Sequence, residues 1–191
     1  YEKKLALTSD GDARIAIQSK IGQLYEDEVK DDARAIAAYQ AILDAAGDEP
    51  SALRSLDRVY QRNAMWKELA EIIGRQLIIV GPEDDKLAHV ELKYRIGQLR
   101  ERELGDQVGA IDAYRDILDL MPAHERARTA LETYLAPGAL GASGEKHRLL
   151  VAGILEPVYE QLGEWTPLIG VHEIQLAAER DALRRGGLQL R

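Results

Sequence analysis

An internal repeat constrains the fold of this chain more than any other feature of its sequence. When the sequence is compared with itself at an offset of 75 residues, residues 21–44 align with residues 96–119, and 14 of the 24 pairs are identical. Chance would give about one or two identities over this length. A second match, at an offset of 99 residues, pairs Val59, Tyr60, Trp66, Leu69, Gln76 and Leu77 with Val158, Tyr159, Trp165, Leu168, Gln175 and Leu176. Such copies predict a row of similar units.

The repeated segments have the periodicity of amphipathic helices. Ile17, Ile21 and Leu24 recur at spacings of three and four residues, which places them on one helix face. The chain holds 26 alanines and 26 leucines but no phenylalanine, and this favours helices over strands. The pattern predicts helices over residues 13–29, 35–43, 49–62, 64–80, 83–104, 106–120, 123–135, 145–162 and 164–184. Because the breaks are short, we expect antiparallel hairpins in units of about 12–47, 48–81, 83–122, 123–144 (degenerate) and 145–184.

Two glycines inside the predicted helices indicate close packing. Gly22 and Gly97 each cost a helix about 1 kcal/mol relative to alanine, so we expect a neighbouring helix to pack against the backbone there. Tyr39 and Tyr114 are expected to fill the space beside them. Small residues on the same helices play the complementary part: Ala35, Ala38, Ala110 and Ala113.

The glycine-rich segment 136–144 is predicted to be a linker between helices. It lacks the pattern of a phosphate-binding loop, since Glu145 separates Gly144 from Lys146 and no serine or threonine follows. Pro157 either kinks its helix or begins a new one. The last residues, 186–191, are expected to start a further unit, so the chain is expected to be part of a longer protein.

The units resemble the tetratricopeptide repeat (TPR) family, and most closely the divergent repeats of large bacterial TPR proteins. The resemblance rests on Gly22, Tyr25, Ala35 and Tyr39; on Leu56, Tyr60, Leu69 and Ile73; and on Gly97, Ala110, Tyr114 and Pro122. The family's typical tryptophan of the first helix is missing. The resemblance implies an all-α fold, a right-handed α-solenoid of antiparallel helix hairpins, whose concave groove receives a peptide or protein.

By analogy with the family, the groove is formed by exposed positions on the first helix of each unit. These candidate peptide-binding residues are Ser19, Lys20, Gln23, Arg54, Arg58, Arg62, Tyr94, Arg95, Gln98 and Arg102. The basic residues among them would favour an acidic or carboxylate-bearing partner through bidentate contacts. The alternative is that they belong to ordinary solvated helix faces. The clamp for chaperone tails is not expected, because Ser19, Gln23 and Ser55 replace its lysine and asparagines and only Arg95 is retained.

Other residues are expected to have structural roles. Trp66 and Trp165 recur at one place in two units, which favours packing wedges over binding hot spots. Acidic pairs in turns, such as Asp31 with Asp32 and Asp84 with Asp85, are expected to cap helices. The four histidines, at positions 89, 124, 147 and 172, lack a zinc-binding spacing. The sequence therefore predicts no enzyme, no cofactor and no metal.

Composition also bears on the class of ligand, on membrane insertion and on the cellular compartment. A formal charge of −8 disfavours nucleic acid as a ligand, and no stretch is long and apolar enough to predict a membrane span. The absence of cysteine fits a reducing cytosol and an oxidising periplasm alike; we favour the cytoplasm.

These observations predict a non-catalytic protein–protein interaction scaffold. One alternative is a regulatory or sensory repeat domain attached to a catalytic domain outside this chain. Another is a spacer that self-associates.

Overall fold

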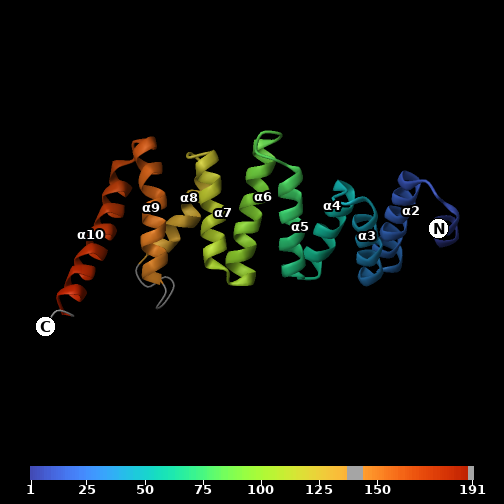
Figure 1. Cartoon of the computed structure of the whole chain (residues 1–191), viewed down its shortest axis with the longest axis horizontal. Coiled ribbons are helices and arrows are strands. Elements are labelled where there is room, and N and C mark those ends of the chain that lie inside the picture. Colours follow the sequence, from blue (N-terminus) through green and yellow to red (C-terminus); the bar gives the residue numbers. More distant parts are fainter. Residues whose placement is uncertain (137–143, 189–191) are drawn as a thin grey trace. The chain divides into compact units, whose positions relative to one another are not determined.

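A computed structural model describes residues 1–136 and 144–188, except for the side chains of Glu2, Asp181, Ala182 and residues 184–188. All regular structure in these residues is helical (Figure 1). The α-helices are α1 (Glu2–Leu7), α2 (Gly11–Leu24), α3 (Asp32–Ala46), α4 (Pro50–Arg62), α5 (Trp66–Ile79), α6 (Lys86–Leu99), α7 (Gln107–Leu120), α8 (Glu125–Glu132), α9 (Gly144–Leu162) and α10 (Trp165–Leu188). The short helix α1 was not predicted.

The chain forms two compact units, Tyr1–Leu92 and Lys93–Arg191. In the first unit α2 packs against α3, α3 against α4, and α4 against α5 (Figure 1). In the second unit α7 packs against α8 and α9, and α9 packs against α10. Within each unit these helices contact neighbours along the chain, the arrangement expected of stacked hairpins. No helix of the described residues combines the length and apolar character that crossing a bilayer requires.

The predicted contact between glycines and tyrosines is confirmed in both repeats. A Cβ atom added to Gly22 would lie 2.5 Å from Cε1 of Tyr39, and one added to Gly97 would lie 2.7 Å from Cε1 of Tyr114. Both tyrosine side chains are fully buried. The expected small residues are buried beside them: Ala35, Ala38, Ala110 and Ala113.

The first helix of each repeat ends differently from the prediction. The periodicity predicted continuous helices to residues 29 and 104, whereas the structure has π-helical turns at η1 (Tyr25–Val29) and η2 (Arg100–Leu104). A π turn has i→i+5 hydrogen bonds in place of the i→i+4 bonds of the α-helix. Glu26 lies in the first of these turns and is buried. Each turn ends at a residue in the left-handed region, Lys30 with φ 60° and Gly105 with φ 65°.

Helix caps follow the acidic turn residues. The carboxylate of Asp31 accepts a hydrogen bond from the backbone N–H of Arg34 (3.0 Å), and that of Asp85 accepts one from Ala88 (3.0 Å). These satisfy N–H groups that a helix leaves unpaired. At α4 the cap is Glu49, whose carboxylate accepts from the backbone N–H of Ala52 (2.8 Å).

The structure also bears on the predicted unit at 123–144, on Pro157 and on the two tryptophans. The unit expected at 123–144 contains α8 and a 3₁₀ turn, η3 (Thr133–Leu135), and the rest of the linker, 137–143, lies outside the described residues. Pro157 lies inside the continuous helix α9 and so does not begin a new helix. Trp165 is 65% exposed, so its predicted role as a packing wedge is wrong; Trp66 is half-buried.

Candidate functional site

The structure gathers part of the predicted groove into a hollow in the first unit. This hollow lies between α2 and the start of α4. Its lining includes Ser19, Lys20 and Gln23 from α2, together with Glu49 and Ser51 from the next hairpin. Lys20 and Gln23 are exposed to solvent. The carboxylate of Glu49 is already engaged, because it accepts hydrogen bonds from the Ser51 hydroxyl (2.5 Å) and the Ala52 N–H (2.8 Å).

A second hollow lies at the corresponding place in the second unit. Its lining includes Tyr94, Gln98 and Arg102 from the first helix and its π turn, and Glu125 and Arg126 from the start of α8. The offset of 75 residues relates the two linings: Ser19, Gln23 and Ser51 correspond to Tyr94, Gln98 and Arg126. The two hollows thus share three lining positions of the repeat, and each lies between the first helices of successive hairpins.

The two hollows differ in chemistry. The first is lined by polar and charged side chains together with Ile15 and Ala16, whereas the second has an aromatic wall. The guanidinium of Arg126 lies 4.0 Å from the centroid of the Tyr94 ring. The amide of Gln98 donates to the Tyr94 hydroxyl (3.3 Å), and the ring of Tyr114 lies 5.7 Å from that of Tyr94. Both rings are buried, whereas Arg126 is exposed. The planar surface that this hollow offers to a ligand is therefore the guanidinium of Arg126, which the buried rings support from below.

Two of the predicted groove arginines have a different, structural role. Arg58 on α4 donates from Nε to Oε1 of Glu26 (2.8 Å) and from Nη2 to Oε2 (2.7 Å), a bidentate pair. Arg62 reaches the same carboxylate (3.2 Å) and also pairs with Asp32. Both arginines connect the second hairpin to the first, and their charges are engaged with carboxylates of this chain.

The electrostatics of this cluster follow from its contacts. Hydrogen bonds from Arg58 hold the pKa of Glu26 below its usual range, against the opposing effect of burial. Hydrogen bonds from Asn63 and Arg62 lower the pKa of Asp32 in the same way. Tyr39 donates to Glu26 (3.1 Å), and burial raises the pKa of this tyrosine to about 12. The ionised carboxylate and the neutral phenol are therefore the stable forms.

The second repeat satisfies its equivalent glutamate without arginine. Glu101 accepts hydrogen bonds from the hydroxyls of Tyr114 (3.0 Å) and Tyr134 (2.9 Å). Burial raises the pKa of both tyrosines. A third bond of this kind joins Tyr159 to Glu132 (2.8 Å). Hydrogen bonds from a buried tyrosine hydroxyl to a glutamate carboxylate therefore recur in both units.

The other predicted groove residues are distributed as follows. Arg54 is exposed on α4 and lines neither hollow. Arg95 is half-buried and interacts with other groups of the chain. Residues from the start of the following hairpin, such as Ser51 and Glu125, were missed because the prediction considered only the first helix of each unit.

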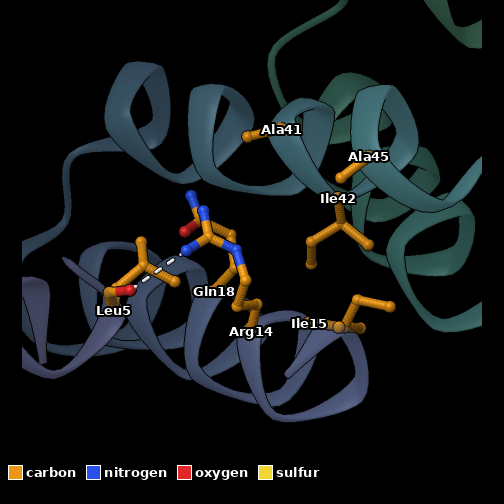
Figure 2. Close-up of a pocket in the computed structure, with 8 residues that line it drawn as sticks. Leu5, Arg14, Ile15, Gln18, Ala41, Ile42 and Ala45 are labelled. Carbon is orange, nitrogen blue, oxygen red and sulfur yellow. Dashed lines mark hydrogen bonds between the residues drawn. The ribbon is translucent and has the colours of Figure 1, made fainter. Parts of the chain in front are cut away.

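A different cavity in the first unit lies between α1, α2 and α3 (Figure 2). Apolar side chains line it, including Leu5, Ile15 and Ile42. Arg14 lies among them and donates to the backbone oxygens of Leu5 (3.1 Å) and Thr8 (3.0 Å). Because these bonds fasten α1 to α2, the cavity belongs to the packing of α1.

Two of the histidines contact backbone atoms, and a third lies near a glutamate of α9. His89 is buried, with Nδ1 2.6 Å from the carbonyl oxygen of Val80. His124 caps α8 by accepting from the N–H of Ala127 (3.2 Å). His172 on α10 is half-exposed and lies beside Glu156 of α9, at 3.7 Å.

No protein-family model matches the chain, and a comparison with curated proteins finds no match either. The functional argument therefore depends on the two hollows and on the residues that line them.

Proposed function

We propose that this chain is a non-catalytic scaffold that binds a peptide or protein partner in its hollows. The observation that carries the proposal is the recurrence of one hollow at the same repeat position in both units. Packing needs Gly22 and Tyr39 at their repeated places, but it does not need exposed polar side chains to be gathered twice. A repeated site suits an extended segment that presents several side chains in succession.

The lining supports a partner with acidic side chains. Each hollow contains an exposed cation, Lys20 in the first and Arg102 in the second, and carboxylates are the natural partners of these cations. Each hollow also has two carboxylates of its own, Asp12 and Glu49 in the first and Glu101 and Glu125 in the second. The amides of Gln23 and Gln98 can donate to and accept from the backbone of an extended peptide. We further propose that the hairpins form a right-handed, TPR-like solenoid, which the packing of neighbouring helices within each unit supports.

Affinity capture with mass spectrometry tests this proposal. The whole chain is used as bait beside the double variant Lys20→Glu with Arg102→Glu. Both residues are exposed and form no ion pair among the described residues, so the variant is expected to keep its fold. We expect the double variant to lose most of the captured acidic partner.

The matched control is Lys67→Glu with Lys146→Glu, two exposed lysines outside both hollows. Because both variants reverse two positive charges, they have the same formal charge. Capture that is equal for the two variants would mean that the hollows do not bind the partner.

A further inference from the structure

Three potential metal ligands converge between the last two helices of the second unit. Glu156 and Glu160 lie one turn apart on α9, and His172 lies on α10, which packs against α9. One donor atom from each residue can be chosen so that all three lie within 4.8 Å of one another. The side chains of His172 and Glu156 are 45% and 32% exposed, so an ion can reach them from solvent.

The charges of this group are not balanced by the chain. Glu160 and Glu156 are four residues apart on one helix, where like charges repel by about 0.2–0.5 kcal/mol. Among the described residues, neither lysine nor arginine forms an ion pair with Glu156, and Glu160 has no side-chain partner. Glu26, by contrast, is paired with two arginines. A divalent cation would supply the missing positive charge.

Comparison of the two related hairpins shows that this group is a departure from the repeat. At the offset of 99 residues, Gln175 and Glu156 correspond to Gln76 and Asp57, and both pairs form the same amide-to-carboxylate bond, at 2.7 Å and 3.1 Å. This bond is part of the fold. His172 and Glu160, however, stand where the first copy has Ile73 and Gln61.

The replacement of Ile73 by His172 and of Gln61 by Glu160 changes the same part of the second hairpin. Ile73 is 1% exposed and packs in the core of the first unit, so a histidine in its place gives up apolar packing. The same hairpin gains a carboxylate within reach of that histidine. Both changes add a metal-ligating side chain beside the carboxylate that the repeat already provides.

From this geometry we propose that Glu156, Glu160 and His172 bind a divalent transition-metal ion, for which Zn²⁺ is the best match. Imidazole suits zinc better than magnesium or calcium, which prefer all-oxygen sites. Zinc takes nitrogen and oxygen ligands at about 2.0–2.2 Å, so small rotations of exposed side chains bring the three donors into range. Water fills the fourth position. The amide of Gln175, which donates to Glu156, orients that ligand from outside.

The experiment is a titration of the untagged whole chain with ZnCl₂, followed by isothermal calorimetry, with Co²⁺ absorption as a second reading of imidazole coordination. The variants restore the first copy's residues: His172→Ile and Glu160→Gln. Both side chains already occur at the corresponding place in the first hairpin, so both variants are expected to fold, and circular dichroism checks this. The control is Glu173→Gln, an exposed neighbour outside the group.

We expect the wild type and the control to bind one Zn²⁺, and each restoring variant to bind it more than about tenfold more weakly, since even supporting residues contribute 10- to 100-fold. Equal Zn²⁺ affinity in the wild type and in either folded restoring variant would overturn the proposal. Equal affinity of the wild type for Zn²⁺ and Mg²⁺ would also overturn it, because it would indicate attraction to carboxylates without the histidine.

Discussion

At the scale of single residues, the hairpins of the two 75-residue repeats each depend on a contact between a glycine and a tyrosine ring. The ring of Tyr39 packs directly against the backbone at Gly22. The hydroxyl of Tyr39 donates to Glu26, which lies one turn after Gly22. Tyr114, Gly97 and Glu101 repeat this arrangement. One tyrosine thus fixes both the distance between two helices and their register.

The close approach at Gly22 makes a testable prediction about stability. In the variant Gly22→Ala the new methyl group must displace a fully buried ring, and we expect a net loss of about 1–2 kcal/mol in the free energy of unfolding. The control Gly153→Ala lies inside α9 with no atom within 4 Å of its new Cβ. There helix propensity alone acts, and a gain of about 0.5–1 kcal/mol is expected. Urea denaturation measures both, and effects of the same sign would refute the contact.

Glu26 makes a prediction about pH. Its pKa is lowered in the folded chain, whereas the unfolded value is about 4.3. Between these two values the unfolded chain binds more protons, so its contribution to stability is present above pH 4.3 and is lost as the pH falls through the folded pKa. We expect Glu26→Gln to be about 1–3 kcal/mol less stable at pH 7 and to lose less stability on acidification. Denaturant titrations from pH 7 to pH 3 give both slopes, and parallel slopes would contradict the assignment.

Much of the packing could be predicted from the sequence, whereas the buried charges could not. A buried face leaves a local signal, as Ile17, Ile21 and Leu24 show, because every turn must contribute an apolar residue. The partners of Glu26 are distant: Arg58 lies on another hairpin, and so it looked like a groove residue. The predicted packing role of Trp165 was wrong for a related reason. Recurrence of a residue in the sequence does not show whether a neighbouring helix covers its position.

At the scale of elements, the π turns determine how the first helix of each repeat ends. Both turns are followed by a residue in the left-handed region, which glycine adopts at little cost. The second repeat has Gly105 there, whereas the first has Lys30. A lysine in this conformation costs about 1–2 kcal/mol.

We therefore expect Lys30→Gly to stabilise the chain by about 1 kcal/mol, and Gly105→Lys to destabilise it by a similar amount. Thermal unfolding followed by circular dichroism measures the change. Lys30→Ala loses the same charge but keeps a Cβ atom in the left-handed conformation, so it controls for the loss of charge. A melting temperature for Lys30→Gly no higher than that of Lys30→Ala would contradict the expected strain.

For the hollows, too, the sequence predicted the residues of one helix but not those that come from the next hairpin. Their first wall lies on α2 and on α6, where Lys20 and Gln98 were predicted from the sequence. Their second wall comes from the start of the next hairpin, whose position depends on the tertiary packing of α4 and α8. The Glu156, Glu160 and His172 group was missed because its ligands are divided between two helices.

At the scale of the whole molecule, the chain consists of two compact units, each with its own buried core. In repeat proteins stability is approximately a sum of local terms and terms between neighbours. We expect Gly22→Ala to increase amide hydrogen exchange mainly within residues 1–92, and Gly97→Ala mainly within residues 93–188. Exchange followed by mass spectrometry resolves the two regions, and a uniform increase throughout the chain would show that they unfold as one.

Glu26 also limits where the chain can be cut. Its carboxylate is bound by Tyr39 of its own hairpin and by Arg58 of the next, so a fragment that stops before α4 would retain a buried anion stripped of its counter-ions. Anyone who wishes to express a minimal module should therefore place the C-terminal boundary after Arg62, and a recombinant fragment that ends at Gly47 is expected to be insoluble or protease-sensitive.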